Sequence, residues 1–391
     1  MFARPGTVSL LGFLLAITGC SINAGVESLD HVEPVVLLDV VHSDSVARVS
    51  EGDIEVLADG RLAFVYQQSG VGGSDFDQMD LVLRTSDDQG ATWTDPEILV
   101  SSSEAAQNVM SPTILRAHDG ELLLFYLRKN GPWDCHMYVR RSDDELATLS
   151  EPVLAIEPEG YFVVNNSRPI QLASGRLLVP ASFHPADGEL EWSSARMSGI
   201  PVIFYSDDVG LTWHQSQTSL ETPPVPGVQL QEPGVIELTD GRVMMWMRTN
   251  DGFQYESFSN DQGVSWSTPV PGPLASPLSP ATIARIPSTN ELVVVWNDRS
   301  GDHPLPDARA DTRAVGGRTP LAVAISSDEG LTWSRSRLLE EGAGINFQYP
   351  AITFDDDRMI VSYTICPLGE GCDIRVKAVD LGWLLGEPSE Q

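Results

Sequence analysis

The stretch from residue 231 to residue 255 holds the densest group of side chains that could do chemistry. Glu232 precedes a strand-like run and Arg248 closes the next one, with the Asp240-Gly241 turn between them. Antiparallel pairing of these runs would place the carboxylate and the guanidinium side by side. Because a guanidinium binds planar anions through two parallel hydrogen bonds, the pattern indicates a site for an anionic group.

Further residues that could join this site are spread through the chain. They are Arg48 with the Glu51 and Asp53 that follow it, Asp75 and Asp77 in a glycine-rich loop, Arg318 at the start of a strand-like run, and Tyr349 before Pro350. Arginines in hairpin turns are better explained by pairing with surface acids. This second group comprises Arg61, Arg176, Arg242 and Arg358.

A repeated eight-residue phrase, Ser-x-Asp-x-Gly-x-Thr-Trp, shows which elements must position these residues. Ser and Asp can bond to the local backbone, Gly adopts a positive φ, and Trp packs beneath the turn. The phrase is therefore a structural turn, which we expect between outer strands. It occurs at 86–93, 206–213, 259–266 (with Ser265 for Thr) and 326–333, with a damaged copy from Ser142 that has Leu146 in place of glycine.

Six hairpin signals alternate with these turns, each a tight turn before a polar residue and an apolar run. Helical periodicity is nearly absent. Units of about 50 to 65 residues match four-stranded propeller blades, so the sequence predicts an all-β, six-bladed β-propeller. The outer strand of the last blade is either 374–379 or the N-terminal segment 34–41, and the sequence leaves both open. Propellers bind ligands at one mouth of the central channel, where the inner strands converge.

Short polar pairs open the inner strand of several units, which predicts that they face the same channel mouth. They are Ser111-Pro112, Ser167-Arg168, Glu232-Pro233, Ser279-Pro280 and Tyr349-Pro350.

The turns and the order of the candidate residues together resemble a known family. The eight-residue turns are similar to the Asp-boxes of sialidases, and nearly the whole chain after residue 33 resembles a bacterial sialidase-family (BNR-repeat) protein. The order Glu232, Arg248, Arg318, Tyr349 is similar to the family's glutamate, second arginine, third arginine and nucleophilic tyrosine. The resemblance implies an exo-α-sialidase-like glycoside hydrolase that needs no cofactor and releases a terminal sialic acid or related acidic sugar from a glycan.

The resemblance also implies a role for each residue. Sialic acid carries a carboxylate on its anomeric carbon, so a neutral tyrosine approaches that carbon without the repulsion that a carboxylate nucleophile would meet. Tyr349 would attack with retention of configuration, and Glu232 would take its proton, since a phenol titrates only near about 10. Arg248 and Arg318 would hold the substrate carboxylate. Asp75 would protonate the leaving oxygen and later activate water.

Several assignments leave a competitor. Asp77 could replace Asp75 as the acid. Arg313 could replace Arg318 in the anion clamp, by which we mean the arginines expected to hold the substrate carboxylate (Arg48, Arg248 and Arg318). Arg168 could be an additional anion contact. Taken singly, each candidate residue also has a purely structural explanation, such as capping a turn or pairing at the surface.

The first arginine of the family motif is matched less well. Arg48 is its counterpart, but Ala47 stands where the family has an aromatic residue, and the two residues after Arg48 differ from the usual Ile-Pro. The carboxylates of Glu51 and Asp53 would weaken an anion clamp unless they point away or contact sugar hydroxyls. This departure allows for a different acidic sugar or a substituted sialic acid.

The N-terminal segment has the layout of a secretory signal, with an apolar run from Val8 to Ile17 and Gly19 before Cys20. A small residue before an early cysteine resembles the lipobox of bacterial lipoproteins, in which Cys20 is lipidated; an ordinary cleaved signal is the alternative. We therefore expect a lipoprotein signal over 1–19, a tether over 20–33 and a propeller over 34–391. The protein would be in the bacterial cell envelope, lipid-anchored at the outer membrane or cell surface, or secreted.

Composition limits the partners and the cysteine chemistry. The net charge of −31 argues against nucleic acid and anionic membranes as partners, so membrane contact is expected only through the lipid anchor. Cys366 and Cys372 are close enough in sequence to form a disulfide in an oxidising compartment, which leaves Cys135 without a partner. Cys135-His136 is an isolated pair of soft ligands, so no metal site is predicted.

Two other functions stay open at this point, because a fold alone does not fix an activity. One is a non-catalytic propeller that binds acidic glycans, and the other is a lyase acting on uronic-acid polymers. An Asp75 carboxyl near Tyr349 in the channel mouth would favour catalysis over binding alone, and a lyase would form an unsaturated product that absorbs in the ultraviolet.

Overall fold

The computed structural model describes residue 1 and residues 32–70, 72–185, 199–218, 220, 225–306 and 317–386. The chain divides into two units, Met1–His31 and Val32–Gln391, and the description below concerns the second. The predictions for the signal over 1–19, for Cys20 and the tether as far as residue 31, and for Arg313 lie outside the described residues and stay predictions.

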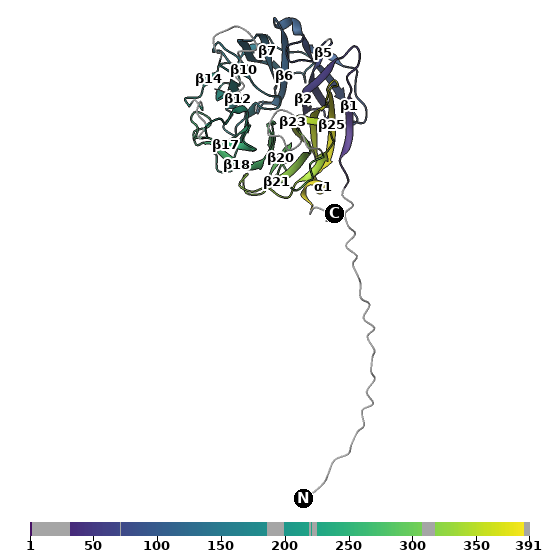
Figure 1. The fold of residues 1–391 in the computed structure, drawn as a ribbon, viewed down its shortest axis with the longest axis vertical. Coiled ribbons are helices and arrows are strands. Elements are labelled where there is room, and N and C mark those ends of the chain that lie inside the picture. Colours follow the sequence, from purple (N-terminus) through teal and green to yellow (C-terminus); the bar gives the residue numbers. More distant parts are fainter. Residues whose placement is uncertain are drawn as a thin grey trace. The chain divides into compact units, whose positions relative to one another are not determined.

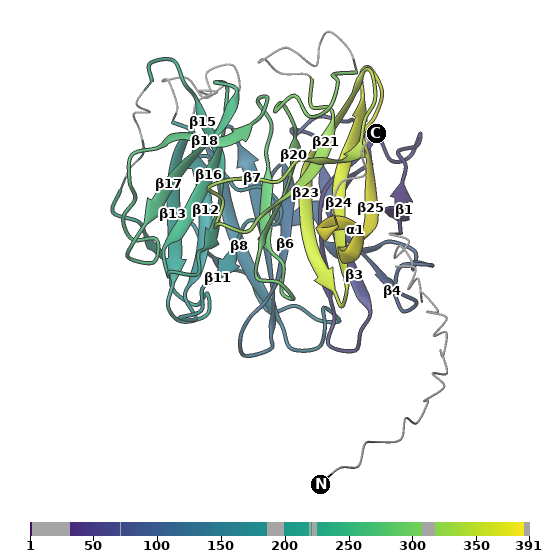
Figure 2. The same ribbon diagram turned by 90° about the horizontal axis from the view of Figure 1, so that it is seen from below.

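The second unit is a ring of six antiparallel sheets, a six-bladed β-propeller, as predicted (Figure 1). Figure 2 shows the blades edge on, with their strands running between the two faces of the ring. Blade 1 consists of β2 (Arg48–Val56), β3 (Leu62–Ser69), β4 (Met79–Ser86) and β5 (Glu97–Val100). After the short 3-10 helix η1 (Ser102–Glu104), blade 2 consists of β6 (Asn108–Arg116), β7 (Leu122–Gly131), β8 (Asp134–Ser142) and β9 (Val153–Leu154).

In blade 3 the inner strand is split into two short pieces that both pair with β12. Its strands are β10 (Phe162–Val163), β11 (Ile170–Gln171), β12 (Leu177–Phe183), β13 (Ile200–Ser206) and β14 (His214–Gln215). Blade 4 consists of β15 (Leu230–Glu237), β16 (Val243–Thr249), β17 (Phe253–Ser259) and β18 (Val270–Ala275). Blade 5 consists of β19 (Thr282–Arg285), β20 (Leu292–Asn297), β21 (Leu321–Ser326) and β22 (Arg337–Glu340).

Blade 6 closes the ring with a strand from the other end of the chain. Its order is β1 (Val35–Val40), β25 (Asp373–Asp380), β24 (Arg358–Pro367) and β23 (Ile345–Asp355). The N-terminal segment is therefore the outer strand, and the alternative with 374–379 outermost is wrong, because β25 pairs on both sides. Figure 1 shows β1 beside β25.

The repeated turns connect the third and fourth strands of blades 1 to 5 and are hydrogen-bonded as predicted. In the copy of blade 3, Asp208 accepts from Ser206 Oγ, Thr212 N and Thr212 Oγ1 at 2.8, 2.8 and 2.6 Å. The damaged copy in blade 2 keeps the equivalent bonds to Asp144, and Leu146 adopts a φ of 69° in place of glycine. The bonds from the aspartate therefore persist where the glycine is lost.

Six hydrophobic clusters lie between neighbouring blades and hold the ring together. Where the ring closes, Ile360 and Ile374 of blade 6 and Val40 of β1 pack with Phe64 and Tyr66 of blade 1. Burying each such side chain contributes about 1.5 to 3 kcal/mol. The inner strands are thus held in place from both sides, which fixes the residues at their ends.

Cys366 and Cys372 form a disulfide between β24 and β25, a pairing that their spacing allowed. Cys135 is buried and has no disulfide partner. In the part of the chain that the structure describes, the short helix α1 (Leu381–Leu385) follows β25, and no helix there has the length and apolar character needed to cross a bilayer.

Candidate active site

The inner strands carry a repeated irregularity that positions the candidate residues. The pairing of the first two strands shifts register at a bulge in blades 1, 2, 4 and 6. One residue at each bulge, and one between the two inner pieces of blade 3, adopts a positive φ. These residues are Glu51 (45°), Ser111 (53°), Ser167 (55°), Glu232 (45°) and Tyr349 (55°).

A positive φ at a residue other than glycine costs on the order of 1 kcal/mol or more, so its recurrence indicates that the surrounding fold imposes it. Bulges re-aim side chains, and here they direct residues of different blades toward one another. Ser111 Oγ donates to Glu51 Oε2 at 2.6 Å, from blade 2 to blade 1. Asn166 of blade 3 donates to the backbone oxygens of Gly52 at 2.7 Å and Tyr349 at 3.2 Å. Among the predicted motifs, those of blades 3 and 6 are joined directly by the Asn166–Tyr349 bond, and those of blades 2 and 3 both contact the bulge of blade 1.

Glu232, Arg248, Arg318 and Tyr349 form the centre of this group. Arg248 Nη1 donates to Glu232 Oε2 at 2.6 Å, which matches the side-by-side placement predicted from the hairpin. Asn165 Nδ2 donates to the same oxygen at 3.3 Å. The side chains of both arginines interact with the Tyr349 hydroxyl, and the Arg318 guanidinium carbon lies 5.7 Å from the centre of the tyrosine ring.

The electrostatics of this centre separate an ionised acid from a neutral phenol. Burial opposes ionisation of Glu232, but Arg248 and Arg318 outweigh it and hold the pKa of this carboxyl below its usual range. Burial, followed by the charge of Glu232, raises the pKa of Tyr349 to about 12. At neutral pH the glutamate is therefore a carboxylate and the tyrosine keeps its proton.

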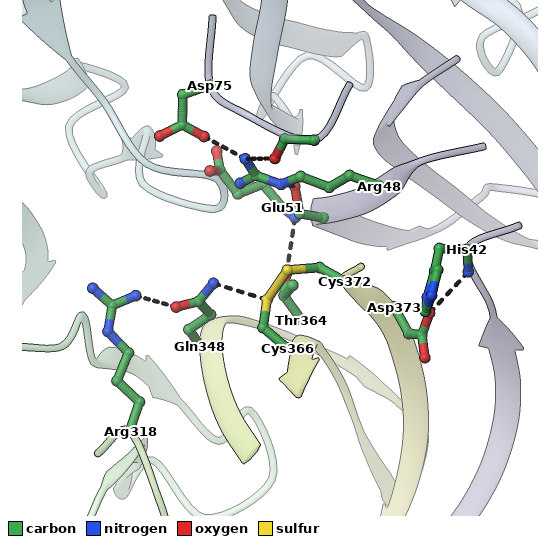
Figure 3. Close-up of a disulfide and its surroundings, with 12 residues drawn as sticks. His42, Arg48, Glu51, Asp75, Arg318, Gln348, Thr364, Cys366, Cys372 and Asp373 are labelled. Atoms are coloured by element: carbon green, nitrogen blue, oxygen red, sulfur yellow. Dashed lines mark hydrogen bonds and ion pairs between the residues drawn. A yellow bond between two sulfur atoms is a disulfide. The ribbon is translucent and has the colours of Figure 1, made fainter. Parts of the chain in front are cut away.

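Arg48 and Asp75 form a second part of the site (Figure 3). Arg48 Nη1 donates to Asp75 Oδ1 at 2.5 Å, and the aspartate side chain is 53% exposed. Burial works to raise the pKa of Asp75, but Arg48, with Lys129 and Arg318, lowers it below the ordinary value. The Asp75 carboxyl thus responds electrostatically to Arg318 as well as to Arg48, which links the two parts of the site.

The disulfide is linked to Arg318 through Gln348 and to the strand of Arg48 through a backbone hydrogen bond (Figure 3). Arg318 Nη1 donates to Gln348 Oε1, and Gln348 Nε2 donates to Cys366 Sγ at 3.3 Å. On the other side of the bridge, the Cys372 backbone oxygen accepts from Val49 N, next to Arg48, at 3.0 Å. Sequence reasoning did not connect the disulfide with the site, because only the fold brings its loop beside β2 and β23.

Two of the predicted candidates have other partners. Asp77 Oδ2 accepts from the backbone and side chain of Ser74, both at 2.8 Å, so it caps its own loop. Arg168 is fully buried, and its guanidinium donates to Ala281 O at 2.7 Å and Thr282 Oγ1 at 3.0 Å. These bonds join the Arg168 guanidinium to blade 5, and it lies 5.7 Å from the Trp246 ring of blade 4, so the anion contact of Arg168 stays a prediction.

The hairpin arginines have the carboxylate partners expected of surface residues, and none of these pairs involves a residue of the candidate site. The pairs are Arg61 with Asp59, Arg176 with Asp207, Arg242 with Asp240 and Arg358 with Asp355.

Lys129 is a site residue whose role the sequence did not reveal. It is buried in β7, its Nζ donates to the Asp75 backbone oxygen at 2.8 Å, and it lies 5.3 Å from the centre of the Phe76 ring. Asn108 Nδ2 donates to the same oxygen at 2.8 Å. Lys129 therefore positions the loop that carries the acid. The sequence shows that lysine is rare, since the chain has only two, but it does not show that Lys129 contacts the Asp75 loop.

Comparison with known proteins places the chain among sialidase-related propellers. A model of the BNR repeat-like domain family matches residues 60–361. Rat Sialidase-3 is 28% identical over 222 residues, covering 50% of this chain and 52% of that protein. A sialidase of Bacteroides fragilis is 24% identical over 313 residues, covering 73% of this chain and 53% of that protein. The chain thus spans about half the length of these curated relatives.

Solved structures agree on the fold. The structure of Trypanosoma rangeli sialidase in complex with the inhibitor DANA superposes with a TM-score of 0.63 at 16% identity, covering 88% of this chain and 59% of that one. At this identity the likeness concerns the fold alone.

Proposed function

This chain belongs to the BNR repeat-like domain family, and we propose that it is an exo-sialidase-like glycoside hydrolase that releases a terminal sialic acid or related acidic sugar from a glycan. The observation that carries the proposal is the convergence of Glu232, Arg248, Arg318 and Tyr349 from three blades at one channel mouth. Its sialidase relatives support the same class of activity.

Tyr349 is proposed as the nucleophile. Its high pKa keeps the phenol neutral at pH 7, so it does not repel a substrate that carries a carboxylate on the reacting carbon. Attack on that carbon requires loss of the phenolic proton. Arg248 and Arg318 both act to lower the pKa of the phenol, so they would stabilise the oxygen as negative charge develops on it.

Glu232 is proposed as the base that takes this proton. The two arginines keep Glu232 ionised, and the negative charge of Glu232 raises the pKa of the Tyr349 hydroxyl. Tyr349 Oη then forms a bond to the anomeric carbon while the bond to the leaving oxygen breaks. Water later cleaves the glycosyl-tyrosine bond, and the product keeps the configuration of the substrate.

The substrate carboxylate would bind to Arg48, Arg248 and Arg318. Each guanidinium has an internal partner, namely Asp75, Glu232 and Gln348. A carboxylate arriving at Arg48 would compete with Asp75, and its negative charge would raise the pKa of the aspartate. Substrate binding would therefore favour the protonated Asp75 that must donate to the leaving oxygen, which supports catalysis rather than binding alone.

The test is to incubate the mature protein with a fluorogenic sialoside and a panel of uronides and to identify the products by mass spectrometry and NMR. We expect release of the free acidic sugar, first in the α-configuration of the substrate. An unsaturated product that absorbs in the ultraviolet would identify a lyase instead, and binding without release would identify a glycan-binding protein.

A further inference from the structure

Glu51 is an acidic residue of the site that the proposed roles do not use. It lies at the bulge of β2 and is 4% exposed. Ser111 Oγ donates to its Oε2 at 2.6 Å, and its backbone N donates to Thr364 Oγ1 at 3.1 Å. The bond to blade 6 holds the backbone at the bulge and the bond to blade 2 holds the carboxyl, so the carboxyl cannot turn toward bulk solvent without breaking the Ser111 bond.

Charged and titratable groups from several elements face this carboxyl. Arg48 of the same strand and Asp75 of the β3–β4 loop lie beside it (Figure 3). Glu232 of β15 in blade 4 and Tyr349 of β23 in the neighbouring blade 6 interact with it electrostatically. Tyr161, next to β10, also responds to its charge. Arg48 is the one cation among these five groups.

We infer that Glu51 takes part in the sugar site as a neutral carboxylic acid beside the anion clamp, and that its ionisation sets the upper pH limit for binding an anionic sugar. This inference rests on the proposed function and specifies the charge state in which that site works.

A count of charges gives the physical reason. With Glu51 neutral, the three arginines of the clamp outnumber the two carboxylates that pair with them, Asp75 and Glu232. With Glu51 ionised these two numbers are equal, so the attraction of this group for a substrate carboxylate is weakened, while the nearby cations Lys129 and Arg168 remain. Among the described residues Oε1 has no hydrogen-bond partner, so the neutral acid can offer its proton to a sugar oxygen.

Burial favours the neutral form at mildly acidic pH. It raises the pKa of Glu51 to about 7, and the neighbouring Asp75 adds to this, while Arg48 and the Ser111 hydroxyl act in the opposite direction. The carboxyl is therefore neutral below about pH 6 and charged above about pH 8.

The test uses the sialic acid analogue DANA as the probe and calorimetry from pH 5.5 to pH 8.5. For the wild-type protein we expect the Kd of DANA to rise about tenfold or more across this range. Glu51→Gln stays neutral, so its Kd should change by less than about threefold. Glu55→Gln is the matched control, because Glu55 lies on the same strand and also has a pKa raised to about 7, but its partner is Arg116 at 3.8 Å rather than the clamp. It should keep the wild-type pH dependence.

Two calorimetric outcomes would overturn the inference: an equal loss of affinity at high pH in Glu51→Gln, or no loss in the wild type. Failure of every protein to bind DANA at any pH would count against the proposed function instead. Infrared difference spectra then decide on Glu51 without a ligand. Glu55 also titrates in this range and is present in both proteins, so the inference is supported if the protonated-carboxyl band lost between pH 6 and pH 8.5 is smaller in Glu51→Gln than in the wild type by the contribution of one carboxyl. Identical spectra for the two proteins overturn it.

Discussion

The outer turns and the inner bulges are both repeated around the ring, and both use positive φ angles, yet they differ in how their side chains vary. The outer turns present the same Ser, Asp and Thr in blade after blade, bonded within one short segment. The inner bulges present Glu51, Ser111, Ser167, Glu232 and Tyr349, a different residue in almost every blade.

The side chains of the outer turns repeat because the fold needs them, whereas the side chains at the inner bulges vary with their chemical roles. An outer turn needs the same hydrogen bonds wherever it occurs, so its sequence is retained. An inner bulge needs only the backbone geometry to be retained, and each side chain can then serve a different purpose at the shared channel mouth. Substitutions in the two regions should therefore have different consequences.

The largest expected effect is at the Tyr349 bulge. Tyr349→Phe removes the attacking oxygen and should lower kcat/KM by about a thousandfold or more. The ring and its packing remain, so Tm and the circular dichroism spectrum should be unchanged. Turnover at the wild-type rate by a folded Tyr349→Phe protein would remove Tyr349 from the mechanism.

The second-largest effect is expected from a substitution in the anion clamp. Arg318→Lys keeps the positive charge but loses the planar fork that contacts Gln348 and would hold a carboxylate. We expect an increase in KM of about 10- to 100-fold. Steady-state kinetics measure this effect, and Arg285→Lys, at a pair with Glu329 away from the site, is the matched control that should leave KM unchanged.

Breaking an outer turn should affect stability without affecting catalysis. Asp208→Ala removes four hydrogen-bond acceptor contacts and should lower Tm by about 2 to 5 °C, with kcat/KM unchanged. Asp144→Ala in the damaged copy should have a similar effect, because it keeps three of the four bonds that Asp208 makes. A loss of activity at the growth temperature in either variant would show that the two regions are coupled.

The smallest effect is expected at the exposed hairpin pair. Arg61 donates to Asp59 at 2.8 Å, with side chains that are 38% and 51% exposed. Such pairs contribute little in water, so Arg61→Ala should shift Tm by less than about 1 °C and leave kinetics unchanged. A larger shift, measured by calorimetry, would mean that the hairpin arginines do more than cover the surface.

Local patterns were predictable from the sequence because their bonds form within a few residues or across a single hairpin. This applies to the outer turns, to the hairpins and to the pairing of Glu232 with Arg248. The matching position of Ser111, Ser167, Glu232 and Tyr349 was also predictable, since each stands at a similar place ahead of a hairpin turn.

Features that depend on distant parts of the chain were not predictable. The closing strand β1 pairs with β25 from the other end of the chain, and the sequence left two closures open. The environment of Glu51 depends on its burial and on the Ser111 bond from blade 2. The position of the Arg168 guanidinium depends on its hydrogen bonds to blade 5. In each case the deciding contact joins segments that no short pattern relates.

The most direct test of the central claim is to trap the glycosyl-enzyme with 2,3-difluorosialic acid and to locate the label by peptide mass spectrometry. The account predicts one added sugar on the peptide that contains Tyr349 and no label in Tyr349→Phe. A label on Glu232 or Asp75, or hydrolysis of sialosides with no label on the tyrosine, would contradict it.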